Sequence, residues 1–193
     1  MKKFTLYILT AFGLMGLATS CNDFGDVNND PMNLNPGVVD YKMEFTQVEA
    51  QICGSDWDVW RNGCIYTANM IQHTASVDWA YGVFYTWNDQ YSGAYWGGFY
   101  SGGRAAIRNI IDVMNNWEGN PAYANEYQMC RILKAYMFQN MTDLYGDVPY
   151  SEAGQGYSTN PIPYPKYDTQ EAIYNDLLKE LDEAQAALST SCL

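Results

Sequence analysis

Basic side chains are scarce in this sequence. Ten Lys and Arg stand against 22 Asp and Glu, so the net charge at pH 7 is −12. Proteins that bind nucleic acid need Lys and Arg to neutralise phosphates, and simple adhesion to an anionic membrane surface needs the same residues. The composition therefore argues against a nucleic-acid partner and against purely electrostatic attachment to a membrane.

Histidine and closely spaced cysteines are also lacking. His73 is the single histidine, and none of the five cysteines lies in a Cys-x-x-Cys motif. A structural zinc site takes four such ligands at characteristic spacings, so we expect no metal and no cofactor. Cys53 and Cys64 fall on neighbouring segments with helical character, where they either form a disulfide or remain as buried free thiols.

The N-terminus carries a secretory pattern. Lys2 and Lys3 precede an apolar stretch over residues 4–18, which is too short for a comfortable membrane span, and small residues lead up to Cys21. This order is typical of a bacterial lipoprotein signal, in which Cys21 becomes the first mature residue and carries acyl chains. Cleavage near Ser20 with an unmodified cysteine is the alternative. We favour lipidation, because a cysteine at this place has no packing role in the mature protein. Several acyl chains on Cys21 would anchor the protein firmly.

Three segments follow from this interpretation. Residues 1–20 form the lipoprotein signal peptide, residues 21–40 a lipidated tether rich in Asn, Asp, Gly and Pro, and residues 41–193 a helical domain. Removal of the signal peptide takes away two lysines and no acid, so the mature net charge is −14.

The domain has helical rather than strand periodicity. Helices are predicted over residues 41–53, about 55–74, about 94–117, about 120–145 and 168–188. Ser55, Asn120 and Asp168 are expected to cap the second, fourth and fifth of these helices, and Gly146 to end the fourth in the left-handed conformation. The fold class is therefore all-α, with antiparallel helical hairpins of the tetratricopeptide type.

Apolar residues at three- and four-residue spacing predict the buried helix faces. These residues are Trp57, Trp60, Cys64, Ile65, Ala68 and Ile71 in the second helix, Met129, Ile132, Leu133, Tyr136, Met137, Met141 and Leu144 in the fourth, and Ile173, Leu177, Leu178, Leu181, Ala184 and Leu188 in the fifth.

Residues 76–92 are aromatic but lack a clean period, so we predict a loop. Tryptophan is uncommon in an exposed loop unless it has a partner. The candidate binding residues of this loop are Asp78, Trp79, Tyr81, Trp87 and Asn88. The alternative is that these rings fold inward onto the helices, as we expect of Trp96 and Tyr100.

Four segments resemble those of the SusD/RagB family, the surface glycan-binding lipoproteins of Bacteroidetes. The most specific is "RILKAYMFQNMTDLYGDVPYSEA" (131–153), in which a helix runs into a Tyr-Gly-Asp-Val-Pro-Tyr turn. Residues 20–31 resemble the lipidated cysteine with its acidic tether, and residues 95–114 and 167–184 resemble two helices of the family.

The resemblance implies a scaffold of tetratricopeptide-like hairpins with a glycan-binding face and no catalysis. In the family the loop after the second helix often lines the sugar site, so the resemblance implies glycan binding by Asp78, Trp79, Tyr81, Trp87 and Asn88, with flat aromatic faces against the apolar faces of sugar rings. It implies capture of an oligosaccharide or polysaccharide and its delivery to a SusC-like TonB-dependent transporter. Asp23 and Asp26 resemble the signal that sends such lipoproteins to the cell surface, so we expect a lipid-anchored protein of the outer membrane. Family members are usually more than twice as long, so we expect this chain to be an N-terminal part of the fold with exposed apolar stripes on its last helices.

Three other interpretations remain open. The chain is a membrane-anchored helical scaffold that binds only protein partners, a non-functional fragment, or an enzyme that acts on glycans. A glycosidase would need two carboxyl groups facing each other across a cleft, for which Asp147 and Glu152 are the candidates in the turn. The resemblance implies no such activity, and we interpret the turn as structural.

Overall fold

The computed structural model describes residues 40–52, 54–101, 105–156 and 160–189. Helices make up the secondary structure of these ranges, and no strand occurs in them, which confirms the all-α prediction. The signal peptide, Cys21 and the tether up to residue 39 lie outside the described residues, so lipidation stays a prediction. Within the described ranges no helix combines the length and the apolar character needed to cross a membrane.

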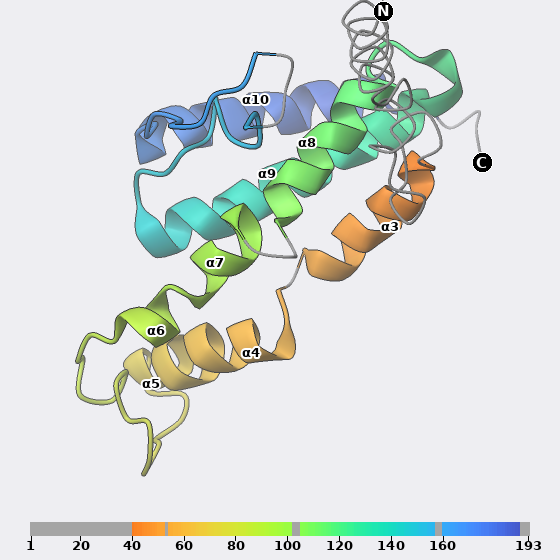
Figure 1. Ribbon diagram of the computed structural model, residues 1–193. Helices are drawn as coiled ribbons and strands as arrows, with labels where there is room; N and C mark the ends of the chain where they lie inside the picture. Colours follow the sequence, from red (N-terminus) through yellow and green to blue (C-terminus); the bar gives the residue numbers. More distant parts are fainter. Residues whose placement is uncertain (1–39, 53, 102–104, 157–159, 190–193) are drawn as a thin grey trace, which may run out of the picture. The chain divides into compact units, whose positions relative to one another are not determined.

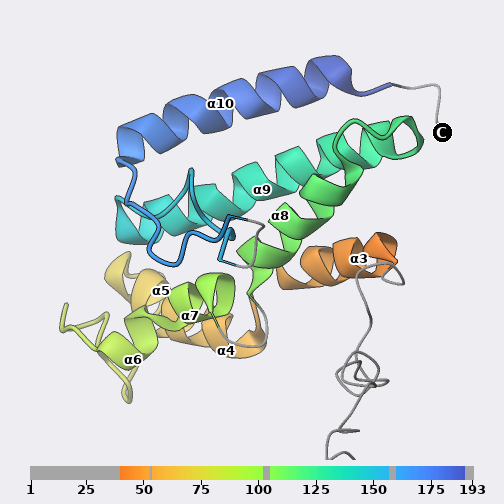
Figure 2. The same cartoon turned by 45° about the horizontal axis from the view of Figure 1, so that its top comes forward.

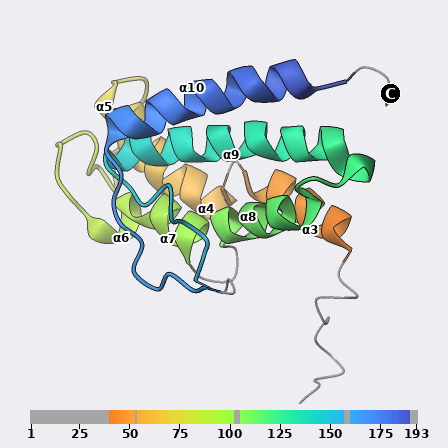
Figure 3. The same cartoon turned by 90° about the horizontal axis from the view of Figure 1, so that it is seen from above.

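Four helices enclose the main core. They are α3 (Tyr41–Gln51), α8 (Ala106–Trp117), α9 (Ala124–Tyr145) and α10 (Gln170–Ala187), and α3 packs against α8 (Figure 1). The turned views show α9 between α8 and α10 (Figures 2 and 3). Helices α9 and α10 are antiparallel, because Asn125 at the start of α9 is bonded to Ser189 just after α10, and Gln170 at the start of α10 is bonded to Thr142 near the end of α9.

Aliphatic and aromatic side chains from these helices fill the core. The fully buried residues include Val48 from α3, Ile107, Ile110 and Val113 from α8, Met137, Phe138 and Met141 from α9, and Ile173 from α10. Complete burial of one such side chain stabilises the fold by about 1.5–3 kcal/mol.

The predicted single helix over residues 94–117 is wrong. The structure has two helices there, α7 (Ala94–Tyr100) and α8, separated by Ser101 with extended backbone and Ala105 with a φ of 35°. Neither conformation continues a helix, and glycine costs about 1 kcal/mol relative to alanine within one.

Two of the predicted caps are confirmed. Ser55 Oγ accepts from the Asp58 amide, and Asp58 Oδ2 accepts from the Ser55 amide at 2.9 Å, which forms a capping box. Asn120 accepts from the Ala122 amide at 3.0 Å and so caps the 3-10 turn η2 (Pro121–Tyr123), which leads into α9.

The two other helix-end predictions need correction. The cap of α10 is Thr169, whose hydroxyl accepts from the Ala172 amide, because Asp168 is bonded to another segment. Gly146 ends α9 with the predicted positive φ of 75°, but its ψ of −122° lies outside the left-handed helical region.

The predicted buried face of α9 is wrong in part. Met137 and Met141 are buried, but Met129, Tyr136 and Leu144 are each more than 40% exposed. Because α9 contacts both α8 and α10, its buried positions are not confined to one stripe, and they include the small residues Cys130 and Ala135.

The predicted buried face of the last helix is wrong at Leu178, Leu181 and Leu188, which are exposed, although the resemblance did imply uncovered apolar side chains on the last helices. Ile173, Leu177 and Ala184 are buried, whereas Leu178 and Leu181 are exposed and line a groove between α9 and α10.

Of the two alternatives for Cys64, a disulfide or a buried free thiol, neither describes the structure fully. Cys64 is a free, exposed thiol, and Cys53 lies outside the described residues. Cys130 is a free, buried thiol, and burial raises its pKa to about 12.

Candidate functional site

A continuous helical stretch carries the exposed Trp57 and the half-buried Trp60. It consists of α4 (Asp56–Asp58), the π-helix η1 (Val59–Thr67) and α5 (Ala68–Met70). The wider π winding is visible in the Ala68 amide, which donates to the Gly63 carbonyl five residues earlier. π-Helical turns are rare and occur frequently at functional sites.

Aromatic rings from this stretch and from two later segments surround one open pocket. The aromatic pocket is lined by Asp56, Trp57, Trp60, Arg61, Trp79 and Tyr91. Trp79 comes from the loop after α5, and Tyr91 from the short helix α6 (Asp89–Ser92). Three separate segments therefore supply its walls.

Trp60 is the centre of the ring cluster. Its centroid lies 5.4 Å from that of Trp57, 5.2 Å from that of Trp79 and 6.0 Å from that of Tyr91. The interplanar angles are 79°, 82° and 89°, the edge-to-face geometry that aromatic pairs favour. Rings that meet at right angles form the walls of a recess rather than one flat platform.

Much of this aromatic surface is open to solvent. The exposed fraction is 63% for Trp57 and 47% for Trp79. Contiguous exposed apolar surface with a polar rim is typical of binding sites. Asp56 and Arg61 supply polar groups among the rings.

Arg61 lies against two of the rings. Its guanidinium carbon is 5.4 Å from the centroid of Trp57 and 5.8 Å from that of Tyr91. At such distances a cation is attracted to the electron-rich face of an aromatic ring. The two contacts fix the charged group within the pocket.

The loop that carries Trp79 is fastened to the π-helix. The Gly82 amide donates to the Ile65 carbonyl at 3.2 Å, and the Tyr85 hydroxyl donates to the Met70 carbonyl at 3.1 Å. A Cβ at position 82 would lie 2.5 Å from the Ile65 carbonyl oxygen, so only glycine allows this approach.

The backbone at Trp79 is strained. Its φ of 47° is left-handed, and the carboxylate of Asp78 accepts from its amide at 2.9 Å. Left-handed backbone costs a residue other than glycine about 1–2 kcal/mol. Such strain is found at functional sites, where the surrounding structure holds a side chain in a required position.

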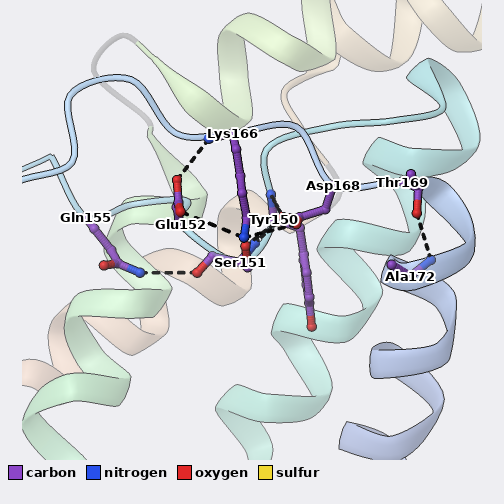
Figure 4. Close-up of polar contacts among 8 residues, drawn as sticks. All are labelled: Tyr150, Ser151, Glu152, Gln155, Lys166, Asp168, Thr169 and Ala172. Carbon is purple, nitrogen blue, oxygen red and sulfur yellow. Dashed lines mark hydrogen bonds and ion pairs between the residues drawn. The ribbon is translucent and has the colours of Figure 1, made fainter.

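The Tyr-Gly-Asp-Val-Pro-Tyr turn fastens the end of α9 to the start of α10 (Figure 4). Asp168 Oδ2 accepts from the Ser151 amide at 2.7 Å, the Ser151 hydroxyl at 2.8 Å and the Tyr150 amide at 3.3 Å. Burial raises the pKa of Asp168, but these hydrogen bonds and the charge of Lys166 outweigh it and bring the pKa below its usual value.

Both carboxylates considered for a glycosidase pair are engaged in this turn. Asp147 accepts from the Gln170 amide at 2.9 Å, and Glu152 accepts from the Lys166 amide at 3.0 Å. The Tyr150 hydroxyl donates to Asp176 at 2.6 Å, and burial raises the pKa of Tyr150. These contacts support the structural interpretation of the turn.

Comparison with known families decides the relationship. A SusD-like family model, described as "Starch-binding associating with outer membrane", matches residues 38–192. The chain belongs to the SusD-like family.

Two solved structures are similar to this SusD-like chain. A "chitin-binding protein" is 33% identical with a TM-score of 0.65, over 78% of this chain and 31% of that one. A protein described as "Bacteroidetes AC2a SusD-like" is 29% identical with a TM-score of 0.64, over 79% of this chain and 27% of that one. The chain thus spans less than a third of either protein. A comparison with curated proteins found no match.

The five predicted glycan-binding residues do not share one surface in this SusD-like chain. Trp79 lines the aromatic pocket, and Asp78 supports its backbone. Tyr81 packs between the rings of Tyr66 and Tyr91, and Asn88 caps α6 by accepting from the Tyr91 amide at 3.3 Å.

Trp87 lies apart from the lining of the pocket. Its ring is 74% exposed, and its indole nitrogen donates to Asp89. The glycan-binding roles of all five residues remain predictions, of which the geometry favours that of Trp79.

Sequence reasoning missed most of the pocket. Trp57 and Trp60 were assigned to a buried helix face, whereas the buried positions of that stretch include the polar residues Asn62 and Asn69. A regular α-helical period does not describe a π-helix, and this shifts the predicted face. The only sequence signal of a binding site in this stretch is the proximity of Arg61 to Trp57 and Trp60.

Proposed function

We propose that this chain is the aromatic-lined part of a non-catalytic, surface-exposed glycan-binding lipoprotein of the outer membrane. The observation that carries the proposal is the aromatic pocket, in which Trp57, Trp60 and Trp79 offer ring surface to solvent beside Asp56 and Arg61. Rings of this kind stack on the apolar faces of sugars, and charged side chains bind sugar hydroxyls.

The family supports the same function. Its model is described as starch-binding and associated with the outer membrane, and one similar structure is a chitin-binding protein. The chain spans less than a third of either solved relative.

Titration calorimetry against a panel of soluble starch, chitin oligosaccharides and other polysaccharides tests glycan binding. We expect binding to at least one glycan, and weaker binding by about fivefold or more in the Trp79→Ala variant, because truncation of an aromatic anchor in a binding site costs upward of about 1 kcal/mol. Phe84→Ala, which removes an exposed ring outside both the pocket lining and the predicted glycan-binding residues, is the matched control. Equal losses in both variants would refute the pocket as the site, and release of reducing ends would favour an enzyme.

We further propose that Cys21 is lipidated and that residues 21–40 tether the domain to the membrane. Labelled palmitate should enter the parent and fail to enter Cys21→Ala in cells. Cys64→Ala is the control, because Cys64 is a free, exposed thiol of the domain. Equal labelling of Cys21→Ala and the parent would refute the anchor.

The proposed partner is a SusC-like TonB-dependent transporter, over which the lipoprotein would deliver its glycan. Affinity purification of the chain from its own outer membrane should recover such a transporter. Recovery of other proteins without the transporter, combined with no glycan binding, would favour the anchored scaffold.

A further inference from the structure

Arg61 has no acidic partner within the part of the chain that the structure describes. Its guanidinium makes no ion pair and no hydrogen bond there, although its Nε is buried. A buried donor without an acceptor is unfavourable. The chain has 22 acidic residues, so an arginine left without a carboxylate is unexpected.

Arg131, by contrast, has hydrogen-bond acceptors for all three of its side-chain nitrogens. Its Nε lies 2.7 Å from Glu180 Oε2, and one terminal nitrogen lies 2.6 Å from Glu183 Oε2. A third nitrogen donates to Gln128 at 3.2 Å. Arg131 is thus used to join α9 to α10, whereas Arg61 contacts only rings.

The two ring contacts leave the edge of the Arg61 guanidinium for a ligand. Trp57 and Tyr91 interact with its charge, while its N–H groups lie in the guanidinium plane and remain without acceptors. Such a planar fork matches a carboxylate, which accepts two parallel hydrogen bonds. Because Arg61 lines the aromatic pocket, a sugar stacked on the neighbouring rings would hold its substituents close to this fork.

The surrounding charges limit the number of acidic groups in the ligand. Asp56 lines the same pocket, Asp78 adjoins Trp79, and the whole chain has a net charge of −12. A polyanion would be repelled by these carboxylates, whereas one carboxylate placed at Arg61 would not be.

We infer that the aromatic pocket selects an oligosaccharide with a single acidic sugar, whose carboxylate is bound by Arg61. The inference rests on the proposed glycan-binding function and adds a specificity-determining residue to it. The neutral sugars of such a ligand would contact the tryptophans, and the acidic sugar would lie beside Trp57 and Tyr91.

The test uses an array of oligosaccharides in matched pairs. In each pair one member carries a single glucuronic acid, and the other is the same molecule with that carboxyl group reduced to a primary alcohol. We expect the parent chain to bind the acidic member of its preferred pair at least about tenfold more tightly.

Variants then assign the preference to Arg61. Arg61→Gln should lose the preference, so that its affinities for the acidic and the neutral member become equal, and Arg61→Lys should retain part of the preference because the charge remains without the fork. Lys179→Gln, the control, removes one exposed positive charge from α10 and should leave the affinities for both members of the pair unchanged.

The outcomes separate this inference from the function on which it rests. Equal binding of both members by the parent, or equal losses on both members in Arg61→Gln, would overturn the role of Arg61 and leave glycan binding intact. Failure of the parent to bind any glycan on the array would overturn the proposed function itself. The preference for the acidic member is measured on the parent chain alone, so it can be tested even if a substitution disturbs folding.

Discussion

The buried rings around Trp117 and the exposed rings around Trp60 lie in opposite surroundings. Trp117 is 3% exposed and stacks on Tyr123 at 5.0 Å with an interplanar angle of 14°. Trp57 is 63% exposed and meets Trp60 edge to face at 5.4 Å. The contrast shows that the number of aromatic residues says little about binding. The neighbours of each ring decide whether it builds the core or faces a ligand.

The largest expected effect separates the two groups directly. Trp117→Ala removes a buried ring and should lower the free energy of unfolding by about 3–5 kcal/mol. Trp57→Ala should change it by less than about 0.5 kcal/mol, because most of that ring is already in water. Urea unfolding followed by circular dichroism measures both. Similar losses in the two variants would show that the exposed cluster supports the fold.

Adjacent leucines of α10 provide the same contrast on one helix. Leu177 is 4% exposed and Leu178 is 61% exposed. Leu177→Ala should cost about 2–4 kcal/mol, while Leu178→Ala should cost less than about 1 kcal/mol. Thermal unfolding of both variants gives the comparison. A large cost at Leu178 would indicate that the groove between α9 and α10 is covered in solution.

Gly82→Ala should disturb the exposed rings around Trp60 and leave the buried rings around Trp117 in place. The added Cβ would clash with the Ile65 carbonyl oxygen, so the loop must shift, at a cost of about 1–3 kcal/mol. Because this loop positions Trp79, glycan affinity should fall, and the fluorescence of the exposed tryptophans should change. Gly97→Ala is the control, since no atom lies within 4 Å of a Cβ there. Parent-like affinity in Gly82→Ala would mean that the loop position does not matter.

The smallest expected effect concerns the turn between α9 and α10. The pKa of Asp168 is lowered in the fold, so its contribution is fully present above the unfolded value of about 3.9 and is lost as pH falls through the folded value. Asp168→Asn should therefore cost about 1 kcal/mol at pH 7 and progressively less below pH 4. Unfolding measured from pH 7 to pH 3 follows the difference. A constant difference across this range would contradict the charged role of Asp168.

Much of the helical scaffold was predictable from sequence, because it depends on local signals. Capping residues at Ser55 and Asn120 and the glycine at 146 mark helix ends through backbone hydrogen bonds and positive φ. The cap of α10 was misplaced by one residue, because Asp168 is used by a segment 17 residues earlier in the chain. A local pattern does not report such a contact.

The pocket was less predictable for two physical reasons. The π winding of η1 changes which side chains share a face, so Trp57 and Trp60 were assigned to the interior. The recess also depends on a loop that returns to η1 through the Gly82 amide and brings Trp79 to Trp60. Of the five predicted site residues, only Trp79 lines the pocket. Asp78, Tyr81, Asn88 and Trp87 make hydrogen bonds or ring contacts within the neighbouring loop and helix α6.

The most direct test of the account is the affinity of a double variant, Trp57→Ala with Trp79→Ala, for the glycan that the parent binds best. Calorimetry should show loss of measurable binding while the unfolding midpoint stays close to that of the parent. Phe84→Ala, which removes a 72% exposed ring outside the pocket lining, should bind as the parent does. Unchanged affinity in the double variant would contradict the claim that the exposed rings around Trp60 hold carbohydrate.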